Sequence, residues 1–149
     1  MRAVVQRVRD ASVAVDARLV GSIGRGVLVY LGVASGDSEK DAEYLADKVA
    51  NLRIFMDSEE KMNLSCLDVG GAALVISQFT LLADARKGRR PSYSEAAEPE
   101  TARVLYEYFV QKLEAAGIVT SKGQFQATMD VSYVNEGPIT ILLDSKKKF

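Results

Sequence analysis

The chain has 149 residues, of which 48% are hydrophobic and 26% are charged, the size and composition of one globular domain. Its 19 basic and 20 acidic residues give a net charge of −1, which excludes an overall basic surface for nucleic acid. The absence of histidine and the single cysteine, Cys66, exclude a Ser-His-Asp triad, a Cys-His dyad, an HExxH zinc site and an internal disulfide.

Three strands are predicted in the first part of the chain. Residues 2–9 and 12–16 favour two short strands, and in the second of these Val13 and Val15 alternate with small or polar residues. Residues 27–33 are continuously apolar, which is typical of a central strand buried on both faces. We therefore expect a sheet to begin at the N-terminal end of the fold.

A helix is predicted over residues 38–52. Ser38 and Asp41 form an S-x-x-D capping box, in which the two side chains bind free amides of the first turn. Five apolar residues then recur at helical spacing and predict one buried stripe: Ala42, Leu45, Ala46, Val49 and Leu52.

The second half of the chain predicts one further helix, preceded by a short apolar strand over residues 72–76. The helix covers residues 99–116. Pro99 suits a first helical turn, where a missing N–H costs nothing, and Gly117 suits the position that ends a helix.

Two strands are predicted at the end of the chain, over residues 128–134 and 139–143. The Gly137-Pro138 pair between them indicates a turn, with Pro138 tolerated at the start of a strand. No linker or internal repeat divides the sequence. We therefore predict a single compact α/β domain over residues 1–149, with two main helices and a mixed, mostly antiparallel sheet that is twisted or barrel-like.

Four short motifs have ordinary structural interpretations. Gly21-Ser-Ile-Gly-Arg-Gly26 reverses the spacing of a dinucleotide-binding loop, so these are interpreted as turn glycines between strands. Lys87-Gly-Arg89 lacks the upstream glycine and the hydroxyl of a P-loop. Cys66 has no histidine to activate its thiol and is interpreted as a packed small residue. The acidic segment 57–61 is interpreted as a solvated turn.

The hydropathy pattern predicts a cytoplasmic protein that does not enter a membrane. Charged or amide side chains interrupt every apolar pair in the first ten residues, so the apolar core of a signal peptide is absent. No stretch approaches the roughly 20 apolar residues that cross a bilayer. A lone cysteine suits a reducing compartment.

A basic segment is a candidate for contact with nucleic acid. Arg86, Lys87, Arg89 and Arg90 place four cations within five residues, and Tyr93 follows them. Such a loop can neutralise several phosphates, and an aromatic ring can stack on an unpaired base. The other interpretation is a solvated basic loop without a ligand, and the segment alone does not separate the two.

A second candidate is the segment Ser77-Gln-Phe-Thr-Leu81, which follows the predicted strand 72–76. Strand ends are where α/β folds present their sites. Thr80 has no neighbouring His or Lys to activate it as a nucleophile. Backbone amides of the segment can still form an oxyanion hole, because that depends on donor geometry and not on side-chain identity.

The chain contains five motifs that are informative as a set: Arg53-Ile-Phe55, Lys61-Met-Asn63, Ser77-Gln-Phe-Thr-Leu81, Lys87-Gly-Arg-Arg-Pro-Ser92 and Asn135-Glu-Gly-Pro-Ile-Thr140. Together with the opening Arg2-Ala-Val-Val-Gln-Arg-Val8, they resemble the D-aminoacyl-tRNA deacylase family, also called D-tyrosyl-tRNA deacylase. The resemblance spans the whole chain. Its most specific part is Ser-Gln-Phe-Thr followed by Asn-x-Gly-Pro-x-Thr.

The resemblance implies an esterase that needs no metal or cofactor and hydrolyses the bond between a D-amino acid and the 3′ end of tRNA. Glycine would be excluded only weakly, so removal of mischarged glycine is also implied. The family is a homodimer in which Gly137 and Pro138, joined by a cis bond, reach into the partner's active site. Their carbonyls would bind the substrate's amino group and leave no room for an L side chain.

The resemblance also implies roles for individual residues. The reaction centre would contain Ser77, Gln78, Phe79 and Thr80, with amides near Phe79 and Thr80 holding the oxyanion and the 2′-hydroxyl of the terminal adenosine assisting hydrolysis. The remaining substrate-binding residues would be Asn135, Met129 and Phe125. The tRNA phosphates would meet Arg86, Lys87, Arg89 and Arg90.

Three positions depart from the family pattern. Gln126 stands where a small residue is usual, Glu136 replaces Asp, and Ile139 replaces Val. Gln126 either crowds the pocket or faces outward. Two alternatives to a tRNA-dependent esterase stay open: a non-catalytic tRNA-binding module that uses the loop 86–90, and a hydrolase of free small-molecule esters.

Overall fold

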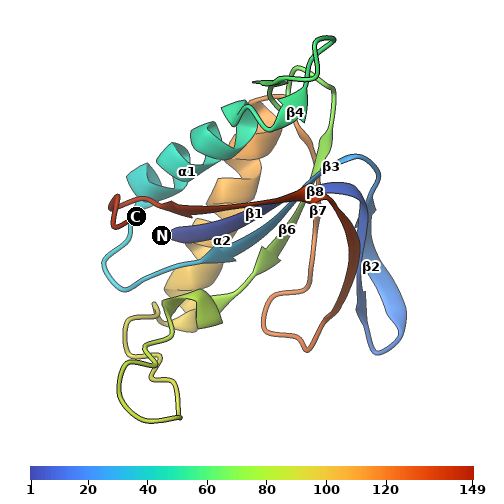
Figure 1. The fold of residues 1–149 in the computed structure, drawn as a ribbon. Helices are drawn as coiled ribbons and strands as arrows, with labels where there is room; N and C mark the ends of the chain where they lie inside the picture. The colour runs from blue at the N-terminus through green and yellow to red at the C-terminus, as the bar shows by residue number, and fades with distance from the viewer.

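Strand β1 is the centre of the sheet, because three other strands pair with it (Figure 1). The computed structural model describes all of residues 1–149. The strands of the sheet are β1 (Arg2–Val15), β2 (Arg18–Ile23), β3 (Gly26–Gly32), β6 (Ala72–Ser77), β7 (Val119–Lys122) and β8 (Asp130–Asp144). A separate hairpin consists of β4 (Phe55–Met56) and β5 (Met62–Leu64).

The sheet is mixed and mostly antiparallel, as predicted. The first half of β1 pairs with β3 and its second half with β2, while β8 pairs along the other edge of β1, all antiparallel. Strands β3, β6 and β7 are parallel neighbours. The backbone N–H of Ser22 donates to the Ser121 hydroxyl at 3.2 Å, which brings β2 against β7. The sheet therefore curls into a nearly closed barrel.

Both predicted helices are present, and their ends differ from the predicted ones by no more than one residue. Helix α1 (Glu39–Asn51) follows Ser38, whose backbone N–H donates to the Asp41 carboxylate at 2.8 Å. Helix α2 (Pro99–Ala115) is followed by Gly117 with a φ of +101°, the left-handed conformation that suits glycine after a helix. Neither helix is long and apolar enough to cross a membrane.

Two apolar clusters stabilise the fold. The larger one lies between the two helices and one face of the sheet, and the smaller one fills the inner curve of the sheet. Strand β3 contributes Val29 and Leu31 to the larger cluster and Leu28 to the smaller one, which confirms a strand buried on both faces. Cys66 is fully buried, and burial raises the pKa of its thiol to about 11. It is a packed small residue, as predicted.

Two strand breaks that the sequence predicts are wrong. The predicted strands 2–9 and 12–16 form one continuous strand, β1, and the last two predicted strands are joined in β8. Gly137-Pro138 is therefore no turn; it lies inside β8, and its peptide bond is cis. Proline is tolerated there because the outer edge of β8 pairs with no strand of this chain. The pairing of β8 with β1 is also irregular near Val8.

Strands β2 and β7 were not predicted, because neither carries a regular apolar pattern. Both are short, and all their residues except Gly21 are exposed or half-buried. Gly21 lies inside β2, paired with β1, and not in a turn as predicted. Glycine is required there because a Cβ would stand only 2.6 Å from the Lys122 carbonyl oxygen of β7. The acidic segment 57–61 is the turn of the β4–β5 hairpin, as predicted.

A buried ion pair joins the two ends of the chain to the loop before α1. The Met1 ammonium nitrogen lies 2.7 Å from Asp37 Oδ2 and donates to the Ser145 hydroxyl at 2.6 Å. The Met1 side chain is 0% exposed and the Asp37 side chain 1% exposed. Asp37 Oδ2 also accepts the N–H of Ala34 at 2.7 Å. This cluster fixes the start of β1 against the end of β8.

Asp37→Ala should lower the free energy of unfolding by about 3–5 kcal/mol, because it leaves a buried ammonium group without its partner. Asp10→Ala is the matched control, since Asp10 is an exposed aspartate of β1, and its effect should stay within about 0.5 kcal/mol. Urea unfolding of both variants measures the difference. A loss below about 1 kcal/mol for Asp37→Ala would contradict a structural role for the pair.

Candidate active site

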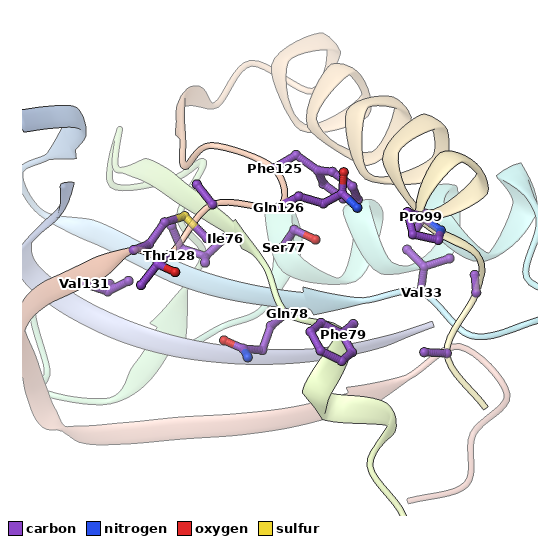
Figure 2. A pocket seen from close by; sticks show the side chains of 15 residues that line it. Val33, Ile76, Ser77, Gln78, Phe79, Pro99, Phe125, Gln126, Thr128 and Val131 are labelled. Atoms are coloured by element: carbon purple, nitrogen blue, oxygen red, sulfur yellow. The ribbon is translucent and has the colours of Figure 1, made fainter. Parts of the chain in front are cut away.

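A cavity of about 600 Å³ opens where β6 ends (Figure 2). Its wall comes from β6, the helical turn η1 (Phe79–Leu82), the start of α2 and the segment between β7 and β8. Figure 2 shows Phe125 and Gln126 on one side of it, Gln78 and Phe79 on the other, and Ser77 between them. Residues far apart in the sequence thus meet around one concave, mostly apolar space.

No ionisable side chain lines this cavity. The polar lining residues are Ser77, Gln78, Gln126 and Thr128, and the others are apolar: Val33, Ile76, Phe79, Ala96, Ala97, Pro99, Ala102, Phe125, Ala127, Met129 and Val131. The chain also contains no group of three or more Cys, Asp or Glu residues that could hold a metal ion. Any chemistry here must use backbone groups, neutral side chains or groups of the ligand.

The junction between β6 and η1 leaves two backbone amides free. The Gln78 N–H donates to the Leu31 carbonyl at 2.8 Å, and the Leu81 N–H donates to the Gln78 carbonyl at 3.2 Å. Phe79 and Thr80 occupy the first two positions of the helical turn, where N–H groups have no intrahelical acceptor. Two neighbouring donors of this kind can stabilise a developing negative charge.

The Thr80 hydroxyl is not activated as a nucleophile. It accepts a hydrogen bond from the Gln78 side-chain amide; Thr80 itself is not among the residues that line the cavity, and none of those residues is basic. An alcohol without a neighbouring base is a weak nucleophile. The side chains of Thr80 and Gln78 therefore bind each other within the turn, and the free backbone donors are the amides of Phe79 and Thr80.

Glycine at position 32 allows strand β3 to approach this turn closely. A Cβ on Gly32 would lie 2.6 Å from Leu82 Cδ2 and 2.9 Å from the Gln78 carbonyl oxygen. Both distances are shorter than real Cβ contacts, so a larger residue would displace the turn. The position of the free amides thus depends on a residue that lies outside the cavity.

The basic segment lies beside the cavity, joined to it by an aromatic contact. Phe79 is 55% exposed, and its ring meets Tyr93 edge-to-face with centroids 5.0 Å apart. Tyr93 follows the loop that contains the four cations, and the backbones of Asp84 and Ser92 pair at the base of that loop. The loop is therefore held at the cavity's edge.

The four cations of this loop differ in whether they are already paired with an acidic side chain of the chain. Arg86 is bound by Asp84 through two side-chain hydrogen bonds of 2.8 and 2.7 Å. These bonds hold the pKa of the Asp84 carboxyl well below its usual range. Lys87, Arg89 and Arg90 are exposed and form no ion pair within the chain. These three are free to meet an anionic ligand, whereas Arg86 stiffens the loop.

Gly137 and Pro138 do not line the cavity of their own chain; both are exposed on β8. Asn135, a predicted substrate-binding residue, instead bridges the backbone around them. Its amide nitrogen donates to the carbonyls of Arg7 at 3.0 Å and Ile139 at 2.9 Å. Asn135 thus supports the conformation of the segment 135–139.

Arg7, for which no role was predicted, supports the same segment. Its side chain is 7% exposed, donates to the Ile54 carbonyl at 2.6 Å and lies 3.2 Å from the Glu136 carboxylate. A Cβ on Gly137 would come within 3.1 Å of its guanidinium. The sequence signal for Arg7 was its spacing in β1: it lies two residues after Val5, and so its side chain points to the same buried face of the strand.

Of the predicted site residues, five line the cavity together: Ser77, Gln78, Phe79, Phe125 and Met129. The Phe125 ring packs on Tyr106 with centroids 5.9 Å apart, and Tyr106 donates to the Val75 carbonyl at 2.8 Å. Gln126, noted as a departure, also lines the cavity, with a φ of +62° that side-chain-bearing residues rarely adopt.

Comparisons with known proteins agree on one family. A family model described as D-Tyr-tRNA(Tyr) deacylase matches residues 4–144. A D-aminoacyl-tRNA deacylase of Koribacter versatilis is 61% identical over the full length of both chains, and one of Roseiflexus castenholzii is 60% identical over 97% of this chain and 92% of its own.

Two solved structures have the same fold. The c-Myc DNA Unwinding Element Binding Protein is 38% identical, with a TM-score of 0.92 over 97% of this chain and 98% of its own. A probable eukaryotic D-amino acid tRNA deacylase superposes with a TM-score of 0.81 over 95% of this chain and 97% of its own. At 18% identity, that second likeness shows the fold alone.

Proposed function

The chain belongs to the D-Tyr-tRNA(Tyr) deacylase family, and we propose that it hydrolyses the ester bond of D-aminoacyl-tRNA. Water adds across the bond, so that its hydroxyl completes the carboxyl group of the free D-amino acid and its proton returns to the ribose oxygen of tRNA. The observation that carries this proposal is the family match over residues 4–144, together with relatives about 60% identical that are named for this activity.

The free amides of Phe79 and Thr80 would bind the oxyanion that forms when the ester carbonyl is attacked. Such donors need no proton transfer and act strongly in a cavity that excludes water. The cavity's lack of ionisable side chains is compatible with this chemistry, because the transition-state charge would be met by dipoles fixed in the backbone.

The substrate itself would supply the group that assists hydrolysis. The chain has no histidine, and the Thr80 hydroxyl already accepts a hydrogen bond from Gln78. The 2′-hydroxyl of the terminal adenosine is adjacent to the ester on the same ribose. We infer that this hydroxyl activates the attacking water, within a pocket where Ser77 and Gln78 contact the adenosine.

Selection of the D form would require a second copy of the chain. Gly137 and Pro138 are exposed and do not line the cavity of their own chain, while Asn135 and Arg7 support the segment that contains them. In a homodimer, their carbonyls would enter the partner's cavity and accept hydrogen bonds from the substrate's ammonium group. An L side chain would then clash with this segment, whereas glycine, which has no side chain, would be excluded only weakly.

The remaining contacts divide between the amino acid and the tRNA. Phe125 and Met129 would pack against the D side chain within the cavity. Lys87, Arg89 and Arg90 would neutralise tRNA phosphates at the cavity's edge. This substrate would place the protein in the cytoplasm.

Purified protein should hydrolyse D-Tyr-tRNA at least about a hundredfold faster than L-Tyr-tRNA, a difference of about 2.7 kcal/mol between the two transition states. Release of tyrosine measures both rates. Equal rates would contradict chiral selection, and binding of tRNA without turnover would favour a non-catalytic binding module. Faster turnover of a free D-tyrosine ester than of D-Tyr-tRNA would favour a small-molecule hydrolase.

Thr80→Ala should lower the rate by less than about tenfold, because the Thr80 hydroxyl is not the nucleophile. Thr128→Ala, which removes a threonine hydroxyl that does line the cavity, is the matched control and should behave like the wild type. A tRNA that ends in 2′-deoxyadenosine and carries its D-amino acid on the 3′-oxygen should react more than about a hundredfold more slowly, because the assisting group is missing. Complete loss of activity in folded Thr80→Ala, with full activity on the deoxy substrate, would point to side-chain nucleophilic catalysis instead.

A further inference from the structure

An arginine of helix α2 lies against the outer wall of the cavity. The Arg103 guanidinium carbon is 5.0 Å from the centre of the Phe125 ring, and its Nη2 lies 3.4 Å from the side-chain oxygen of Gln126. Phe125 and Gln126 both line the cavity, as does the adjacent helix residue Ala102. The cation is thus separated from the cavity by one layer of side chains.

Arg103 is available to a ligand, because the chain does not neutralise it. The side chain is exposed and forms no ion pair with Glu100, one turn before it, or with Glu107, one turn after it. Glu107 is paired instead with Lys122 at 2.7 Å. The one hydrogen bond of Arg103 goes to a neutral amide, so most of its five N–H donors are unused.

The surroundings of Arg103 favour an anion with several oxygen atoms. The cation–π contact with Phe125 and the bond to Gln126 restrict the movement of the guanidinium, which reduces the entropy lost on binding. A guanidinium is matched to the two oxygens of a phosphate, and no acidic side chain lines the neighbouring cavity to repel one.

We propose that Arg103, oriented by Phe125 and Gln126, binds a backbone phosphate of the tRNA acceptor end. The inference rests on the proposed function. When the ester occupies the cavity, the 5′-phosphate of the terminal adenosine lies on the far side of the same ribose. The RNA strand that continues from this phosphate must therefore pass over the rim of the cavity. Figure 2 shows Phe125 and Gln126 across the cavity from Phe79, which contacts Tyr93 beside the basic loop. Arg103 and the loop would then hold the RNA strand from two sides.

The test compares two substrates, one of which has no phosphate. Arg103→Gln should raise the KM for D-Tyr-tRNA about tenfold at low salt, and Arg103→Lys should restore much of the loss because it keeps the charge. Neither variant should change turnover of D-tyrosyl-adenosine. The slope of log Kd for uncharged tRNA against log salt should fall by about 0.7–1 in Arg103→Gln.

The control variant is Arg18→Gln, because Arg18 is an exposed arginine at the β1–β2 turn that also forms no ion pair. It makes the same change in net charge and should leave KM and the salt slope unaltered. Equal losses on both substrates would overturn the proposal, since Arg103 would then act only by holding Phe125. Unchanged KM and tRNA affinity would overturn it as well.

Failure of the proposed function gives a different result. Wild-type protein that hydrolyses neither substrate would overturn the deacylase activity. The affinity of Arg103→Gln for uncharged tRNA would still test the phosphate contact, because that measurement needs no turnover.

Discussion

The hydrogen bond from the Gln78 N–H to the Leu31 carbonyl is the contact on which the site depends. It continues the parallel pairing of β3 with β6 just beyond the last paired residues, and there the chain turns into η1. The close approach at Gly32 seats that turn against β3. The amides of Phe79 and Thr80 are therefore placed by the pairing of the sheet.

Charge is arranged around the cavity and not inside it. The lining is neutral, whereas Lys87, Arg89, Arg90 and Arg103 stand nearby without carboxylate partners. This arrangement suits a substrate with a neutral ester at one end and a polyanionic chain at the other. A cavity with low polarity strengthens each backbone hydrogen bond inside it, while exposed cations attract the RNA from a distance. The net charge of −1 does not reveal this separation between a neutral cavity and the exposed cations around it.

The sequence was informative where local patterns decide the structure. The capping box at Ser38 and the proline at 99 located both helices, and the apolar run 27–33 located the doubly buried strand. Strands β2 and β7 were not predicted because they are defined by pairing with neighbouring strands, and their sequences have no regular alternation of apolar and polar residues. The segment around Pro138 looked like a turn because only the fold reveals that it lies on a free sheet edge.

The candidate site was predictable only as far as the family motifs reach. Ser77, Gln78, Phe79, Phe125 and Met129 belong to segments that resemble the family, and they meet in one cavity. Arg103 lies outside these motifs, and Arg7 lies in the opening segment 2–8, to which no role in the site was assigned. Their importance comes from what they touch, the segment 135–139 and the ring of Phe125, and sequence spacing does not specify such contacts.

The most direct test of a site shared between two copies is the activity of a mixture of two variants, Phe79→Pro and Gly137→Ala. Phe79→Pro removes an oxyanion donor at a position where helices accept proline. Gly137→Ala adds a Cβ that would lie 2.9 Å from Ile139 Cγ1. Each variant alone should be nearly inactive, whereas random pairing should restore about a quarter of wild-type activity, because half of the dimers are mixed and each holds one intact site. No recovery in a mixture that demonstrably contains mixed dimers would contradict the shared site.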